Sequence, residues 1–288
     1  MITASIVKEL RDKTNAGMMD CKKVLTETNG DIEASIKLLR ERGIMKAGKK
    51  SDRAATEGII AARVNDGATS GILFEVNCET DFVSRNDNFQ AFVTEIADKL
   101  AASDAPDHAA ALALPHGEST LEDFVKEKVL QLGENIQLRK YVRFDAASGG
   151  VVASYIHLGG KVGVLLEVGT TKPETASTDG FQELVKDLTL HIAASAPKGL
   201  SRDDIPADIV DAEKEIFRVR LLDQGKPENI IENILKGQLA KFFAESCFLE
   251  QGFVKDPDIT VSQLLENKGK ELGDTLTVTS FVRFGLGE

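Results

Sequence analysis

The sequence contains no tryptophan and only 2 tyrosines, and aromatic residues make up 6% of its 288 positions. A buried core must therefore rely on aliphatic side chains. Hydrophobic residues at 42% and charged residues at 28% are ordinary for a soluble globular protein. No apolar run approaches the roughly 20 residues that cross a bilayer, and the charged, amphipathic N-terminus lacks the apolar segment of a signal peptide. The composition therefore predicts a cytoplasmic protein with no membrane partner.

Positive charge is also scarce. The chain has 35 Lys and Arg against 46 Asp and Glu, which gives a net charge of −11. Phosphate backbones are bound by clustered cations, and the one dense basic run consists of Lys46, Lys49, Lys50 and Arg53. A short run of this kind is more typical of a solvated linker than of a nucleic-acid site. We therefore expect no direct nucleic-acid partner.

The usual motifs of catalysis and of metal or nucleotide binding are absent. The sequence has no GxSxG element, no HExxH or CxxC pair and no GxxxxGK[ST] loop. The cysteines are odd in number and lie far apart, at Cys21, Cys78 and Cys247, which argues against a disulfide framework. We expect no enzymatic activity, no cofactor and no metal site.

Residues 1–44 have the pattern of three short helices. Apolar residues recur at helical spacing, and Asn29-Gly30 is a typical left-handed helix end. Asp20 and Asp31 are candidate caps for the second and third helices. Residues 45–56 follow as a basic linker. A unit this small is marginally stable alone, so we expect it to dock onto another surface.

An internal repeat dominates the rest of the chain. GIIAARVNDGATSGILFEVN (58–77) aligns without a gap on GVVASYIHLGGKVGVLLEVG (150–169), at an offset of 92 positions. Each segment has two alternating apolar runs around a glycine-containing turn, which predicts a β-hairpin. The same offset continues into FQAFVTEIADKLAAS (89–103) and FQELVKDLTLHIAAS (181–195), which have helical spacing. The sequence therefore predicts a duplicated β/α unit.

Each copy also has a third predicted strand. GENIQLRKYVRF (133–144) resembles GDTLTVTSFVRF (273–284), but the offset has risen to 140, so the second copy carries 48 additional residues. We predict an α+β fold with a first core copy at 57–145, a second at 146–195 and 246–288, and an inserted helical hairpin at 196–245. The predicted apolar seam of its first helix consists of Ile209, Ala212, Ile216, Val219 and Leu222. The hairpin either contacts another chain or packs on its own core; the sequence does not decide between these.

The two copies diverge between the hairpin and its helix. The second copy has the polar connector TTKPETASTDG (170–180), whereas the first has CETDFVSRNDN (78–88). Asp87 and Asp179 are the predicted caps of the helices that follow. Phe82 therefore belongs to neither a strand face nor a helix face. Such a residue is either folded back onto the core or held outward as an anchor for a partner, and both alternatives stay open.

Several of these segments resemble the elongation factor Ts family. NCETDFVSRNDNFQAF is similar to the family's signature segment, and TNAGMMDCKKVLTETNGDIEASIKLLR (14–40) is similar to its N-terminal domain. GENIQLRKYVRF and SYIHLGGKVGVLLEV match two further core segments in the expected order. The resemblance implies a ubiquitin-associated-like three-helix domain followed by a duplicated antiparallel β/α core. It also implies a non-enzymatic guanine-nucleotide exchange factor for elongation factor Tu.

The resemblance further implies a mechanism. In the family, the TDFV loop enters between two helices of the partner's GTPase domain, displaces the magnesium ion, promotes GDP release and leaves when GTP binds. The matching residues here are Thr80, Asp81, Phe82 and Val83. Weaker matches for partner contacts are Met18, Met19, Lys22 and His157. A homodimer, or a complex of two chains with two partners, through the hairpin is a further expectation. Some members continue into another helical module after the last strand, and its contacts are not expected here.

Overall fold

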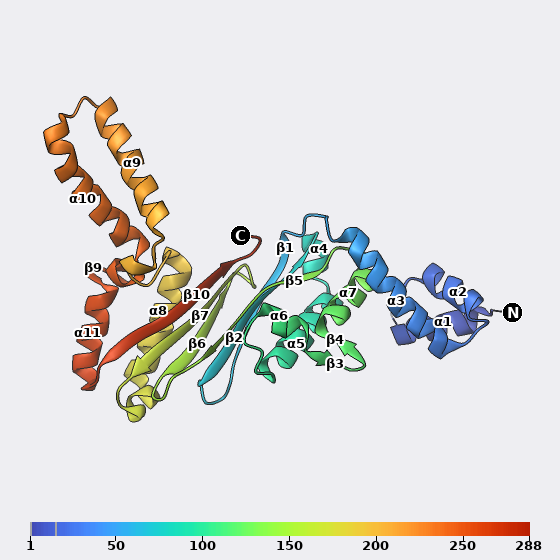
Figure 1. The fold of residues 1–288 in the computed structure, drawn as a ribbon. Coiled ribbons are helices and arrows are strands. Elements are labelled where there is room, and N and C mark those ends of the chain that lie inside the picture. Colours follow the sequence, from blue (N-terminus) through green and yellow to red (C-terminus); the bar gives the residue numbers. More distant parts are fainter. Residues whose placement is uncertain (1, 15) are drawn as a thin grey trace.

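Three helices form a bundle at one end of the molecule (Figure 1). The computed structural model describes residues 2–14 and 16–288, with side chains except at 44–49 and 229. The helices are α1 (Ala4–Thr14), α2 (Met18–Glu27) and α3 (Ile32–Lys50). Their shared core is small and mostly aliphatic, and includes Val7, Leu10, Cys21, Val24, Leu25 and Leu39.

The starts of α2 and α3 test the two predicted caps. Asp31 caps α3 as predicted, because its carboxylate accepts a hydrogen bond from the backbone N–H of Ala34 at 2.9 Å. The prediction for Asp20 is wrong: α2 begins at Met18 with Gly17 as its N-cap. Asp20 lies instead in the first turn, where its charge is favourable beside the positive end of the helix.

The third helix is longer than the sequence indicated. It runs to Lys50 and therefore takes up much of the segment expected to be a linker, so that only residues 51–56 connect the bundle to the next strand. Helix α3 packs along α7 (Leu121–Leu132), and its Arg40 forms an ion pair with Glu127. Of the basic run, the side chains of Lys46 and Lys49 lie outside the described residues.

The first sheet has the strand order β1-β2-β5, and all its neighbours are antiparallel. Its strands are β1 (Glu57–Val64), β2 (Ser70–Cys78) and β5 (Gln137–Asp145). Three helices cover one face of the sheet: α5 (Asp87–Ala101), α6 (His108–Leu112) and α7. The short strands β3 (Pro115–His116) and β4 (Ser119–Thr120) lead into α7.

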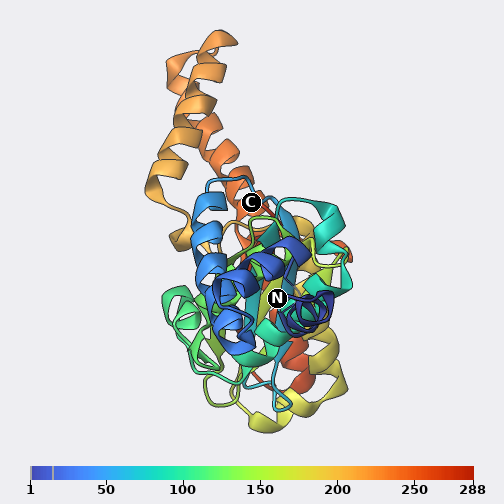
Figure 2. The ribbon, with the colours of Figure 1, turned by 90° about the vertical axis from the view of Figure 1, so that its right-hand side faces the viewer.

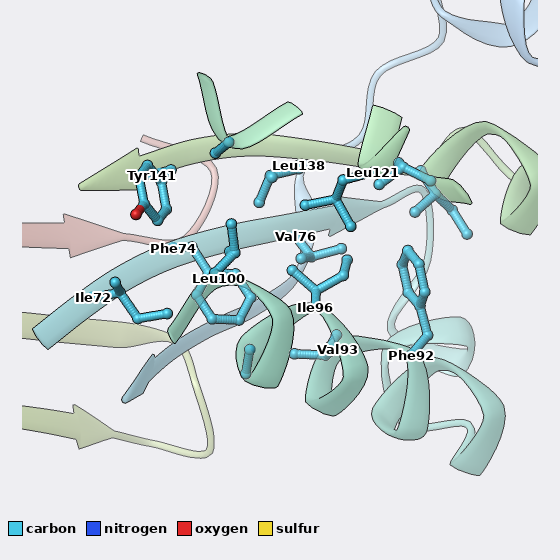
Figure 3. Packing of buried hydrophobic residues seen from close by; sticks show 14 of the residues in the cluster. Ile72, Phe74, Val76, Phe92, Val93, Ile96, Leu100, Leu121, Leu138 and Tyr141 are labelled. Carbon is cyan, nitrogen blue, oxygen red and sulfur yellow. The ribbon is translucent and has the colours of Figure 1, made fainter. Parts of the chain in front are cut away.

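The core between this sheet and its helices is aliphatic with a few phenylalanines, as the composition predicted (Figure 3). Phe74 and Val76 point from β2 toward the helices, where they meet the side chains of α5 and α7. The fully buried residues of this layer include Phe74, Val76, Phe89, Phe92, Ile96, Leu100 and Leu121.

The second sheet has the same architecture, with the strand order β10-β7-β6 and antiparallel neighbours. Its helical layer contains α8 and α11, and short elements connect the remaining chain. The strands are β6 (Val151–His157), β7 (Val162–Thr170) and β10 (Leu276–Gly285). The helices are α8 (Asp179–Ser195) and α11 (Val261–Leu272). The short elements are η1 (Pro173–Ser177), η2 (Arg202–Asp204), η3 (Phe248–Glu250), β8 (Gly252–Phe253) and β9 (Asp256–Thr260).

The two sheets pack against each other through the faces that their helices leave free (Figure 1). Ile60 and Leu73 of the first sheet meet Val152 and Leu165 of the second. Two glycines allow this close approach. A side-chain carbon at Gly71 would lie 2.7 Å from Cγ1 of Val152, and one at Gly163 would overlap Cγ2 of Ile60. Because Gly71 and Gly163 are equivalent under the 92-residue offset, and so are Ile60 and Val152, the contact is reciprocal.

A helical hairpin projects from the second sheet (Figures 1 and 2). It consists of α9 (Ala207–Asp223) and α10 (Glu228–Ser246). Its helices contact each other through Leu221, Ile231 and Leu235. The predicted apolar seam of α9 does not face α10, because all five of its residues are exposed, from Ile209 to Leu222.

Candidate partner-binding surface

The segment that differs between the two halves forms a single helical turn. After β2 ends at Cys78, Thr80 caps the four-residue helix α4 (Asp81–Ser84). The Thr80 hydroxyl oxygen accepts a hydrogen bond from the N–H of Val83 at 3.4 Å. The Ser84 hydroxyl donates to the carbonyl of Asp81 at 3.0 Å. The turn is thus closed by hydrogen bonds to the side chains at both of its ends.

Within this turn, the side chains face different environments. Phe82 is 84% exposed, the largest exposure among the large hydrophobic residues of the described chain. Val83 is half-buried and packs against the first core. Asp81 forms an ion pair with Arg85 at 3.1 Å. The structure therefore decides the alternative that the sequence left open, because the Phe82 ring points outward.

A carboxylate from another part of the chain holds the root of the turn. Glu134 accepts hydrogen bonds from the N–H groups of Glu79 and Thr80, both at 3.0 Å, and from the Thr80 hydroxyl at 2.6 Å. Glu79 in turn accepts a hydrogen bond from the N–H of Asn135 at 2.7 Å. These hydrogen bonds therefore hold the backbone at the start of the turn, while the Phe82 side chain is exposed to solvent.

Asn135 connects the start of the turn to residues 51–56, the tether that joins the N-terminal bundle to β1. Its side-chain amide donates to the carbonyls of Ser51 at 3.2 Å and Arg53 at 2.8 Å. Lys50 at the end of α3 also donates to the carbonyl of Gly133. Because the Asn135 side chain is buried, its two bonds are partly shielded from water, and the bundle and the turn share one anchor.

The buried thiol of Cys78 lies beside the turn and is not a nucleophile. Burial, with the nearby Glu134 carboxylate as a smaller cause, raises the pKa of Cys78 to about 12. The protonated thiol lies 3.2 Å from the carbonyl of Thr80 and donates to it. Burial also raises the pKa values of Cys21 and Cys247. In the described part of the chain, no cluster of His, Cys, Asp or Glu has an arrangement that could hold a metal ion.

The methionines identified in the sequence lie on the N-terminal bundle. Met18 is 55% exposed and Met19 is 75% exposed, at the start of α2. Met19 and Lys22 both line a shallow surface hollow on this helix. An exposed pair of flexible, apolar side chains beside a cation is suited to an adaptable protein contact.

His157 lies at the end of β6 and is exposed. Its Nδ1 atom is 2.9 Å from the Tyr155 hydroxyl, and the two rings stack with centroids 5.7 Å apart. The hairpin turn that follows contacts β1, because the N–H of Ile60 donates to the carbonyl of Gly160 at 2.8 Å.

The predicted site residues therefore form three sets on different elements. Thr80, Asp81, Phe82 and Val83 share one turn, Met18, Met19 and Lys22 share one helix, and His157 stands on the second sheet. Within residues 2–14 and 16–288, no hydrogen bond, ion pair or ring contact joins His157 or the methionines to Phe82. Neither Glu134 nor Asn135 was predicted from the sequence. The match of Gly133 with Gly273 pointed to this segment, but only the fold shows that it holds the turn.

Comparisons with known proteins were consistent across nearly the whole chain. The family model described as elongation factor TS matches residues 79–288. An elongation factor Ts of Trichlorobacter lovleyi is 44% identical over 290 residues, which cover 100% of this chain and 93% of the relative. The protein of the same name from Syntrophotalea carbinolica is 47% identical over 289 residues, with coverage of 100% and 93%. That of Bdellovibrio bacteriovorus is 45% identical over 287 residues, with coverage of 99% and 92%.

Proposed function

Because this chain belongs to the elongation factor Ts family, it is a nucleotide exchange factor for elongation factor Tu in translation elongation, and we propose that Phe82 opens its partner's nucleotide site. The observation that carries this proposal is an aromatic ring that is 84% exposed on a turn fixed from behind. Large exposed apolar residues that are rigidly held are typical energetic anchors of protein interfaces. The factor is not an enzyme, and its cytoplasmic location agrees with its place among the translation factors.

The proposed mechanism is steric and electrostatic. The Phe82 ring occupies space between two helices of the GTPase domain, so that the elements positioning the magnesium ligands shift. Magnesium neutralises the diphosphate, and its loss weakens nucleotide binding. The carboxylate of Asp81 adds repulsion toward phosphate. Its ion pair with Arg85 is an exposed surface pair, which contributes little and is readily exchanged for contacts with the partner.

Exchange of this kind is a coupling between two binding sites, and it is reciprocal. Bound nucleotide must weaken the grip of the factor by the same ratio by which the factor weakens nucleotide binding. GTP rebinding therefore releases the factor. We propose that Met18, Met19 and Lys22 supply a second contact, and His157 a third, which hold the factor on its partner while Phe82 acts.

We further propose that the core arose by duplication of one β/α unit, with the helical hairpin inserted in the second copy and a ubiquitin-associated-like bundle joined to the first. The support is the reciprocal packing of Gly71 on Val152 and Gly163 on Ile60. We propose that a homodimer, or a complex of two chains with two partners, forms on the exposed stripe of α9, from Ile209 to Leu222.

The test is the release of labelled GDP from elongation factor Tu. Truncation of an interface anchor typically costs about 2–4 kcal/mol, so Phe82→Ala should slow factor-stimulated release by roughly 30-fold to 1,000-fold. Asp81→Ala should have a smaller effect in the same direction. The matched control is Glu174→Ala, at the equivalent position of the second half, which should behave as the unaltered chain. Release by Phe82→Ala at the original rate, with the fold intact, would contradict the mechanism.

A further inference from the structure

The carboxylate behind the turn has a counterpart in the second half of the molecule. Asp274 accepts hydrogen bonds from the N–H of Thr171 at 3.1 Å, the N–H of Lys172 at 3.2 Å and the Thr171 hydroxyl. Under the offsets of the repeat, Asp274 is equivalent to Glu134, and Thr171 and Lys172 to Glu79 and Thr80. The same device therefore holds the chain as it leaves the central strand of each sheet.

Both carboxylates are placed by the same backbone geometry. Gly133 ends α7 and Gly273 ends α11, each in the left-handed conformation, with φ of 80° and 65°. Glycine adopts this conformation without steric cost. The acid that follows each glycine then lies between the end of a helix and the start of the third strand, and its side chain faces the segment after the central strand.

The two halves differ in what the carboxylate reaches. In the first half, the Thr80 hydroxyl donates its only hydrogen to Glu134 and therefore presents its lone pairs to the N–H of Val83. The hydrogen bonds thus run from the carboxylate through the hydroxyl to the first turn of α4. In the second half, Lys172 stands in place of Thr80, and η1 has no side-chain cap. Only in the first half do hydrogen bonds link the carboxylate to the short helix after the central strand. That helix, α4, carries Phe82.

We propose that Glu134 is a positioning residue for nucleotide exchange, and this inference rests on the proposed function of Phe82. Glu134 does not act on the partner itself. It fixes the backbone of Glu79 and Thr80 and the orientation of the Thr80 hydroxyl, so that α4 presents Phe82 in one direction before binding. A ring that is pre-oriented loses less conformational freedom on insertion, and this favours the step in which the partner's site opens.

The decisive variant is Glu134→Gln. An amide has one acceptor oxygen, so its NH2 group faces either the two backbone N–H hydrogens, which oppose it, or the Thr80 oxygen, in which case the hydroxyl accepts and no longer donates to a carboxylate. Loss of hydrogen bonds to a charged group of this kind should lower the maximal rate of GDP release, at saturating factor, by about tenfold. The factor concentration that gives half this rate should change by less than about twofold, because Met18, Met19 and His157 are unaltered. A merely structural defect would change both quantities or neither.

Two matched variants separate positioning from general stability. Asp274→Asn removes the equivalent carboxylate and should leave the rate of GDP release unchanged. Glu134→Asp introduces the acid that the second half uses, and should restore most of the lost rate. If Asp274→Asn slowed release as much as Glu134→Gln, or if Glu134→Asp were as slow as Glu134→Gln, the proposal would be wrong.

The double variant Phe82→Ala/Glu134→Gln tests whether the two residues act as a unit. In the Phe82→Ala background, Glu134→Gln should add less than about a twofold loss; a further tenfold loss would show that Glu134 acts independently of the ring. If Glu134→Gln does not fold, Thr80→Val and Thr80→Ser provide the same test at the hydroxyl. Thr80→Val should slow release and Thr80→Ser should not; equal rates would overturn the proposal.

The outcomes also distinguish this inference from the function on which it rests. Phe82→Ala with undiminished exchange overturns both. Phe82→Ala with lost exchange, together with Glu134→Gln at the original maximal rate, overturns the role of Glu134 alone.

Discussion

The turn after β2 and the turn after β7 are built alike but present different surfaces. Each begins beside a carboxylate that holds two successive backbone N–H groups, and each is followed by the long helix that covers its sheet. At equivalent positions, the first turn carries Phe82 and the second carries Glu174, and both residues are exposed. The framework is thus common to both halves, and the proposed activity depends on one side chain placed on it.

The packing beneath the two turns should be equally important for stability. Phe89 and Phe181 are equivalent under the offset, and both are fully buried at 0% exposure. Replacement of either by alanine should lower the free energy of unfolding by about 3–5 kcal/mol, measured by urea unfolding followed by circular dichroism. Phe82→Ala should change it by less than about 0.5 kcal/mol. A cost below about 1 kcal/mol for only one of the buried pair would show that the halves are not equivalent.

The glycines at the contact between the two sheets also test whether the halves are equivalent. Here the expected loss in the free energy of unfolding is smaller. A methyl group at Gly71 would press on Val152, and one at Gly163 on Ile60. Overpacking of this kind typically costs about 1–3 kcal/mol, so both Gly71→Ala and Gly163→Ala should lower the free energy of unfolding by that amount. Gly67→Ala is the control, because a methyl group there meets only Thr69 at 3.8 Å. Neutral behaviour of either sheet variant would contradict the reciprocal packing.

The smallest expected change in the free energy of unfolding comes from a position where one half has a histidine and the other a lysine. His191 is fully buried, whereas its equivalent in the first half, Lys99, is partly exposed. Burial lowers the pKa of His191 below its ordinary value, and the neutral ring accepts a hydrogen bond from the N–H of Val254 at 3.1 Å and bonds Gln251 at 2.9 Å. As the pH falls below about 6.5, the unfolded chain binds the proton first, so the free energy of unfolding falls.

This dependence can be isolated with His191→Gln, which cannot be protonated. Urea unfolding at pH 7.5 and pH 5.5 should show a smaller loss of stability for His191→Gln than for the unaltered chain. All other titrating groups are the same in both proteins. Equal losses in the two proteins would mean that the protonation of His191 has no bearing on the second half's stability.

The sequence predicted the α+β class, the N-terminal helices and the strands of both sheets, because hydrophobic periodicity records which face of an element is buried. The predicted N-caps of two helices were wrong by one residue. The caps of α5 and α8 are Asn86 and Thr178, each one residue before the predicted Asp87 and Asp179. Side-chain oxygens are available at both positions in each case, and only the backbone path decides which one caps.

The hairpin shows where periodicity alone was insufficient. Helix α9 has an apolar stripe containing Ile216 and Val219, and another containing Phe217 and Leu221. Both stripes have helical spacing, and contact with α10 selects the second. The direction of Phe82 was undetermined for a similar reason. It depends on Glu134, whose bond to Thr80 spans 54 positions of the chain, and nothing near Phe82 in the sequence reveals that bond.

The amide group of Asn135 sets a limit on how this molecule can be dissected. Both of its hydrogens go to carbonyls of the tether, at Ser51 and Arg53. A fragment that began after Arg53 would remove both of these acceptors, next to the carboxylate that orients the aromatic turn. The connection between the bundle and the first sheet is therefore a poor place to cut, because the N-terminal segment supplies hydrogen-bond acceptors beside the turn that carries Phe82.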